Sequence, residues 1–84
     1  MYKIFLTPPA QKDFNNLKKK NPPVFKRIVT KLKSLAKDPG AGKPLVGLYK
    51  GVRSLRIGTY RILYEVSEDK IHVYSIKHRK DAYR

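Results

Sequence analysis

The chain has 84 residues and a mass of 9.7 kDa, with 20 lysines and arginines against 6 aspartates and glutamates and no cysteine. This length allows one domain, residues 1–84, and no second core. The missing cysteines exclude disulfides and thiolate metal sites. The net charge of +14 predicts an anionic partner, either nucleic acid or an acidic protein.

The first half of the chain is predicted to form a short strand and two helices. Residues 3–6 favour a strand, and Thr7 followed by Pro8 is typical of a helix start. Apolar residues then recur three and four positions apart to about residue 20, and again after a Pro–Pro break to about residue 37. An Asp-Pro-Gly sequence ends this second helix. Two antiparallel helices joined by a tight turn are expected.

The second half is predicted to be an antiparallel meander. Gly40–Leu45 is expected to be a loop, after which the composition becomes β-branched and aromatic. Short turn sequences separate three predicted strands, Val52–Ile57, Tyr60–Val66 and Lys70–Lys77. With the N-terminal strand added at an edge, the sheet has four strands and is mainly antiparallel. The fold class is α+β, in the order β-α-α-β-β-β, with the helical hairpin packed on one sheet face.

The sheet face opposite the helices is predicted to carry arginines. Side chains alternate along a strand, which places Arg56 and Arg61 on that open face. One interpretation is structural: a single strand arginine commonly pairs with a carboxylate of its own hairpin. The other is a phosphate-binding cluster. Arginines at four positions of neighbouring elements favour this second interpretation, namely Arg53, Arg56, Arg61 and Arg79.

The C-terminal segment, residues 78–84, combines a histidine, several cations and a tyrosine. These residue types suit phosphodiester cleavage. Cations stabilise the crowded phosphorane, a neutral or basic group takes the 2′-hydroxyl proton, and a donor protonates the leaving 5′-oxygen. The alternative interpretation is a frayed basic terminus with no catalytic role.

Other chemistries have no support in the sequence. His72 and His78 are the two histidines and have no carboxylate cluster beside them, so no metal site is predicted. No glycine-rich phosphate loop is present, and no cofactor is expected. No apolar run approaches the roughly 20 residues that cross a bilayer. A cytoplasmic protein without a membrane partner is expected.

Two segments resemble motifs of the RelE/ParE toxin superfamily. Residues 55–64, LRIGTYRILY, resemble its R-x-G-x-Y-R-(hydrophobic)2-Y hairpin, and residues 78–83, HRKDAY, resemble its C-terminal H-R-x-x-x-Y motif. Leu45 and Gly47 fit the L-x-G that precedes the hairpin. The resemblance covers nearly the whole chain. It implies the α+β fold above and the toxin half of a type II toxin–antitoxin pair. Its RelE-type members cleave mRNA in the ribosomal A site without metal, leaving a 2′,3′-cyclic phosphate.

The resemblance also implies roles for individual residues. Arg61 and Arg79 would hold and neutralise the scissile phosphate, and Tyr83 would orient the nucleophile or stack on a base. Lysines that some members carry on the first hairpin strand have no counterpart here, which makes His78 a candidate general base. Four further cations are expected to contact RNA: Arg53, Arg56, Lys77 and Lys80.

The implied partners are the ribosome with its mRNA and an acidic, RelB-like antitoxin that folds as it binds the toxin. Two other functions stay open at this point. One is a ParE-like protein that inhibits DNA gyrase by binding to it. The other is a nonenzymatic, basic RNA-binding module.

Overall fold

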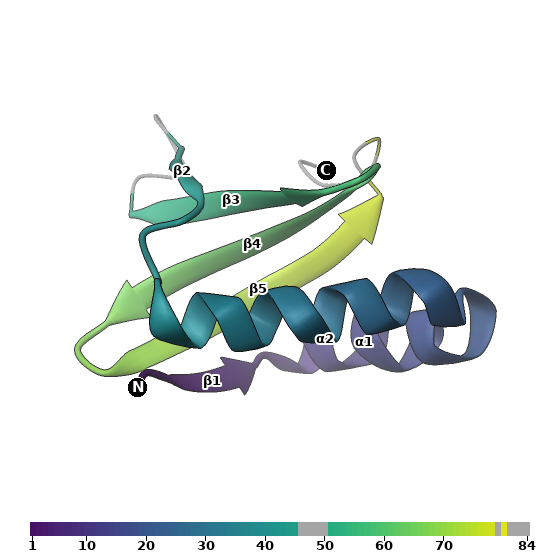
Figure 1. The fold of residues 1–84 in the computed structure, drawn as a ribbon, viewed down its shortest axis with the longest axis horizontal. Coiled ribbons are helices and arrows are strands. Elements are labelled where there is room, and N and C mark those ends of the chain that lie inside the picture. The colour runs from purple at the N-terminus through teal and green to yellow at the C-terminus, as the bar shows by residue number, and fades with distance from the viewer. Residues whose placement is uncertain (46–50, 79, 81–84) are drawn as a thin grey trace.

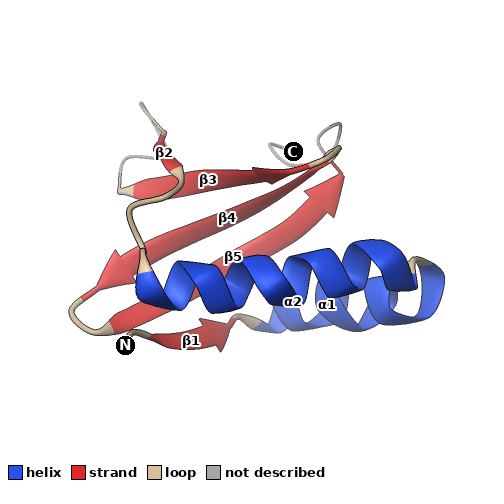
Figure 2. Cartoon of the chain, in the orientation of Figure 1, coloured by secondary structure: helices blue, strands red, loops and turns tan. Residues whose placement is uncertain are grey.

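The computed structural model of the protein describes residues 1–45, 51–78 and 80. In these residues, two helices lie against one face of a five-stranded sheet (Figure 1, Figure 2). None of the described helices is long and apolar enough to span a membrane. The elements in chain order are β1 (Lys3–Leu6), α1 (Pro8–Lys20), α2 (Pro22–Lys37), β2 (Lys43–Pro44), β3 (Val52–Ile57), β4 (Tyr60–Ser67) and β5 (Lys70–His78).

Both helices begin as the capping residues predict. The Thr7 hydroxyl accepts a hydrogen bond from the Ala10 N–H and so caps α1. Asn21 serves both helices: its N–H donates to the Leu17 carbonyl at the end of α1, and its side chain accepts from the Val24 N–H at the start of α2. Prolines occupy the first turns of both helices, where a missing N–H costs nothing. The predicted helical hairpin is confirmed.

The core lies between this hairpin and the sheet. Burying each large apolar side chain of this kind stabilises a fold by about 1.5–3 kcal/mol. Phe14 and Phe25, with ring centroids 4.6 Å apart, join the two helices beside the core. The largest fully buried side chains are Tyr64, Ile28, Leu35, Ile62, Ile71 and Val73.

The strand order is β1-β5-β4-β3-β2, with β1 parallel to β5 and the other pairs antiparallel. The sheet thus contains one strand more than the four predicted. The additional strand, β2, lies within the segment expected to be a loop, where Lys43 pairs with Ser54 and Pro44 with Arg53. A proline is tolerated there because β2 is an edge strand. Two residues are too few to give an alternating pattern, so the sequence could not reveal this strand.

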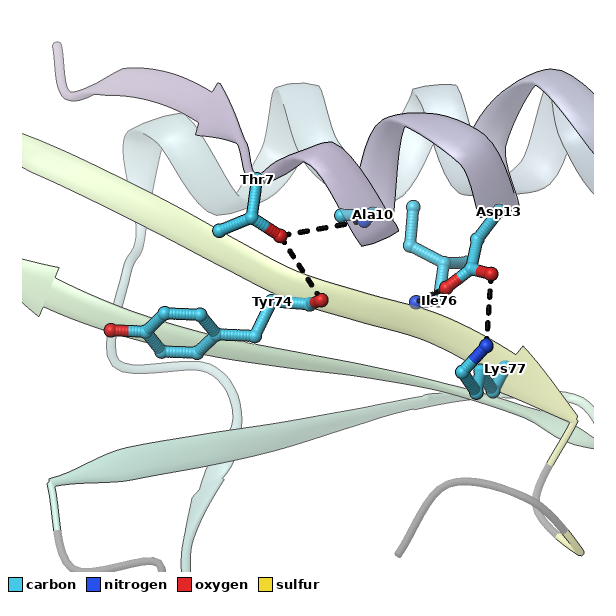
Figure 3. A network of polar contacts seen from close by, with 6 residues as sticks. All are labelled: Thr7, Ala10, Asp13, Tyr74, Ile76 and Lys77. Atoms are coloured by element: carbon cyan, nitrogen blue, oxygen red, sulfur yellow. Dashed lines mark hydrogen bonds and ion pairs between the residues drawn. The ribbon is translucent and has the colours of Figure 1, made fainter. Parts of the chain in front are cut away.

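The free edge of β5 is covered by α1 (Figure 3). β1 pairs with β5 only as far as Val73. Beyond that point the Thr7 hydroxyl donates to the Tyr74 carbonyl at 3.1 Å. Asp13 accepts from the Ile76 N–H at 3.0 Å and from the Lys77 ammonium at 3.0 Å. These contacts satisfy backbone groups that would otherwise leave an open sheet edge.

Candidate nucleic-acid interface

Cations lie side by side across three strands on the sheet face opposite the core. In the sheet register Arg56 of β3 lies directly opposite Arg61 of β4, and Arg61 lies directly opposite Lys77 of β5. Their neighbours Ile57 and Ile62 are buried in the core, so the cations occupy the other face, as alternation predicts. We call these three residues the cation row. Like charges directly opposite in a sheet are destabilising unless they are offset, and the Lys77 ammonium is offset by its ion pair with Asp13 of α1.

A cavity of about 460 Å³ adjoins the cation row between β2 and the β3–β4 hairpin. Arg56, Arg61 and Lys43 line it, and every charged side chain among its described lining residues is a cation. Lys43 is exposed and forms part of the walls contributed by β2. The cavity is therefore a positively charged recess suited to a phosphate group.

The strand that carries Lys43 is held by hydrogen bonds to Gly42. The Gly42 N–H donates to the Tyr64 hydroxyl at 2.9 Å, and its carbonyl accepts from Arg53 Nη1 at 2.8 Å. The same hydroxyl donates to the Pro39 carbonyl at 2.7 Å. A Cβ at Gly42 would lie 2.6 Å from the Tyr64 hydroxyl oxygen, so only glycine permits this close approach. We call Arg53, Gly42 and Tyr64 the clamp.

The Tyr64 hydroxyl is protonated and able to donate over the physiological range. Burial raises the pKa of Tyr64 above that of an ordinary tyrosine, and the Asp38 carboxylate adds to this. The bond from the Gly42 N–H and the charge of Arg53 lower the pKa and offset part of the increase. Because the net change raises the pKa, the Tyr64 hydroxyl keeps its proton and can donate a hydrogen bond to the Pro39 carbonyl.

Replacing Tyr64 with phenylalanine is expected to make stability less sensitive to alkaline pH. A pKa that is higher in the folded than in the unfolded state contributes stability that is complete below the unfolded value, near 10, and is lost as the pH rises through the folded value. Urea unfolding between about pH 8 and pH 11 measures this, and the wild-type curve should fall more steeply than that of Tyr64→Phe. Parallel curves would show that Tyr64 titrates alike in both states.

The structure separates the other predicted cations. Arg53 lies opposite Tyr64 in the register and so shares the core face, away from the cation row, where it contacts Gly42. The Lys77 ammonium forms an ion pair with Asp13, whose side chain is only 12% exposed. Lys80 is exposed, and its N–H donates to His78 Nδ1 at 3.4 Å. Of the four expected RNA contacts, Arg56 is the one that lines the basic cavity.

A β-bulge decides where His78 points. Leu63 pairs with Ser75 but Tyr64 pairs with Val73, so Tyr74 is an extra residue in β5 and alternation shifts by one position. His78 consequently pairs with Tyr60 on the helix side, with the two rings edge to face and 5.5 Å apart. There it lines a second cavity of about 480 Å³, together with Asn16 and Lys20 of α1.

The structure therefore does not bring His78 and Arg61 to the same sheet face. Arg79 and Tyr83 lie outside the described residues. Among the described residues, no cluster of three histidine or acidic side chains is arranged to hold a metal ion. Lys43 was missed by the sequence reasoning because its strand gives no pattern of its own.

Comparisons with known proteins agree on one family. The family model described as the ParE toxin of the type II toxin–antitoxin system matches residues 4–83. Toxin RelG of Mycobacterium tuberculosis is 32% identical over 88 residues, which span 99% of this chain and 97% of that protein. The motif resemblance and the sequence match thus cover the same region.

Solved structures show the same fold. In the RelBE2 toxin–antitoxin complex of M. tuberculosis, one chain aligns with a TM-score of 0.82 and 29% identity over 93% of this chain and 98% of that one. The YoeB–YefM complex of Staphylococcus aureus gives a TM-score of 0.80 and 26% identity over 93% and 97%. The matched family, the related toxin and the shared fold lead to one conclusion: the chain belongs to the ParE toxin family and is a type II toxin of the RelE/ParE superfamily.

Proposed function

We propose that this toxin is a ribosome-dependent endoribonuclease that cleaves mRNA without a metal and leaves a 2′,3′-cyclic phosphate. The observation that carries the proposal is the cation row, in which Arg61 lies between two other cations on a rigid sheet. Positive charges held in this way on one rigid surface can stabilise the charge that develops on a phosphodiester as it reacts. The similarity to RelG and to the toxins of the RelBE2 and YoeB–YefM complexes supports it.

The reaction requires three contributions from the protein. The 2′-oxygen attacks the phosphorus as its proton passes to a base, and the bond from phosphorus to the 5′-oxygen breaks as that oxygen gains a proton. Arg61 and Arg56 face the same cavity and would balance the charge that develops on the phosphorane. Arg79 would be the further phosphate ligand, and Tyr83 would orient the nucleophile or stack on a base.

The position of His78 makes its proposed role as general base separately testable. Its ring contacts Tyr60 on the helix side, so the RNA must pass the end of β5 for the imidazole to reach a 2′-hydroxyl. A His78→Gln variant distinguishes the two possibilities. Loss of the acidic limb in the pH–rate profile supports general-base catalysis, whereas an unchanged profile assigns the proton transfer to another group.

A second candidate function is inhibition of DNA gyrase by binding. The family model that matches residues 4–83 is that of a ParE toxin, which favours this alternative. A nonenzymatic RNA-binding module would use the same basic face.

Primer extension on translated mRNA and a gyrase supercoiling assay, performed on one preparation, separate the endonuclease, the gyrase inhibitor and the RNA-binding module. We expect new ribosome-dependent 3′ ends and unaffected supercoiling. Inhibited supercoiling with intact mRNA would replace the endonuclease by the gyrase inhibitor.

Binding to RNA is expected to weaken steeply with salt. If about four phosphates are neutralised, affinity for single-stranded RNA should fall roughly 50-fold between about 50 and 200 mM salt, since each contact releases a counterion. An RNA with 2′-O-methyl groups in place of the 2′-hydroxyls allows equilibrium measurements, because it cannot be cleaved. A flat salt response would mean that the net charge of +14 does not carry the binding.

We further propose that an acidic antitoxin docks on an apolar groove between β1 and the helices. The groove has a volume of about 540 Å³ and includes Ile4, Phe14 and Val29, with Lys33 and Lys37 also among its lining residues. Apolar walls beside lysines are complementary to an amphipathic acidic helix. The structural neighbours from M. tuberculosis and S. aureus are described as toxin–antitoxin complexes, which supports a partner of this kind.

A further inference from the structure

We propose that Lys43 is a further phosphate-binding residue of the RNA site, and that Arg53 and Tyr64 are positioning residues that hold it there through Gly42. The inference rests on the proposed function in one respect, namely that RNA is the ligand of the basic face. It also revises the role of Arg53, which is expected from the sequence to contact RNA. Arg53 acts on the backbone of the toxin and not on the RNA.

The position of Lys43 relative to the cation row supports the first half of the proposal. Lys43 pairs with Ser54, and residues directly opposite in a sheet share a face. Ser54 lies two residues before Arg56 on the same strand and therefore on the same face. The lysine thus adds a cation from β2 to those of β3, β4 and β5. It lines the basic cavity together with Arg56 and Arg61.

The strand that presents Lys43 is too short to hold itself in place. β2 has two residues, and isolated pairs of strands are marginal even when they are longer. The clamp fixes both backbone polar groups of Gly42, the residue before β2. The Tyr64 hydroxyl accepts a hydrogen bond from the Gly42 N–H, and Arg53 donates one to the Gly42 carbonyl. On the other side of β2, the Leu45 N–H donates to the Val52 carbonyl at 2.9 Å.

The two clamp side chains are themselves rigidly placed. Arg53 and Tyr64 lie directly opposite each other on neighbouring strands, and the Tyr64 ring is fully buried. Their hydrogen bonds connect the end of α2, through Pro39 and Gly42, to the centre of the sheet. The Arg53 guanidinium donates to the Gly42 carbonyl on the core face, so it adds no charge to the open face. Because Lys43 follows Gly42 in the chain, this hydrogen bond instead helps to fix the position of Lys43.

The first experiment measures binding of a single-stranded 2′-O-methyl RNA as a function of salt for Lys43→Ala, with Lys31→Ala as the control. Lys31 is an exposed lysine of α2 that does not line the cavity, so the control removes the same charge outside the proposed site. Loss of one phosphate contact should reduce the salt slope by about 0.7 and the affinity about fivefold at 0.1 M salt. A slope and affinity equal to those of the control would overturn the role of Lys43.

The second experiment tests the clamp with Tyr64→Phe, which changes no charge. Circular dichroism and thermal melting establish that the variant is folded at the assay temperature. We expect weaker RNA binding, and we expect Lys43→Ala to lose most of its effect when it is made in the Tyr64→Phe background. Additive effects of the two substitutions would show that Tyr64 does not act through Lys43, and the clamp would then be a purely structural feature.

The outcomes separate this inference from the proposed function. If mRNA is not cleaved but Lys43→Ala still lowers the salt slope, the phosphate contact stands and the endonuclease fails. If mRNA is cleaved while Lys43→Ala binds as its control does, the endonuclease stands and the inference fails. If the wild-type protein does not bind the RNA probe at about 50 mM salt, where electrostatic attraction is strong, the inference is overturned.

Discussion

Replacing Arg61 with alanine is expected to abolish mRNA cleavage and toxicity while the protein remains folded. Arg61 is on the middle strand of the cation row and lines the basic cavity, so its loss removes charge stabilisation from the centre of the site. Removing one preorganised donor of this type commonly costs about 10²–10³ in rate. Primer extension on translated mRNA gives the rate, and growth after induction gives the toxicity.

Two further variants test whether the loss of cleavage is specific to the guanidinium of Arg61. Arg61→Lys keeps the charge but loses the planar, bidentate guanidinium, so an intermediate rate is expected. Lys31→Ala removes an exposed cation of α2 that does not line the basic cavity and should cleave at the wild-type rate. If folded Arg61→Ala cleaves ribosome-bound mRNA as fast as the wild type, the phosphate role of Arg61 is wrong.

Saturating antitoxin is expected to raise the melting temperature of the toxin and to stop cleavage. A partner that binds only the native state adds about 4 kcal/mol of stability when its free concentration is a thousand times its dissociation constant. In a domain of this size each 1 kcal/mol shifts the melting temperature by about 4–8 °C, so an increase above about 10 °C is expected. The docking groove does not include Arg56 or Arg61, so the loss of cleavage requires that the bound partner also extends carboxylates over these cations. Thermal melting and primer extension over one titration measure both effects.

The docking groove can be tested with two aspartate substitutions on α2. Val29 is half-buried and lines the groove, whereas the neighbouring Thr30 is exposed. Val29→Asp places a carboxylate against an acidic partner and should weaken the antitoxin, whereas Thr30→Asp adds the same charge outside the groove and should leave binding unchanged. Unchanged melting and undiminished cleavage at saturating antitoxin would refute the partnership itself.

The helices and the hairpin strands could be predicted because local rules fix them. The capping Thr7 and Asn21, the paired prolines and the apolar repeats act within one or two turns of helix. The two-residue turn between β3 and β4 fixes which residues pair across the hairpin. Alternation along each strand was therefore enough to place Arg56 and Arg61 on one face. The family motifs lie in the same local segments, which is why the toxin could be identified from the sequence.

The remaining parts of the site depend on contacts between distant residues. The bulge at Tyr74 shifts the alternation of β5, so Lys77 joins the cation row and His78 turns to the helix side. Asp13 reaches Lys77 across 64 positions of sequence, and the Tyr64 hydroxyl reaches Gly42 across 22. No local pattern encodes such contacts, because they exist only after the sheet and helices have packed. The sequence by itself determined the two helices, the other four strands, the arginine pair and the family, but not β2. Only the tertiary structure decided that Arg53 supports Gly42 and that Lys43 completes the basic cavity.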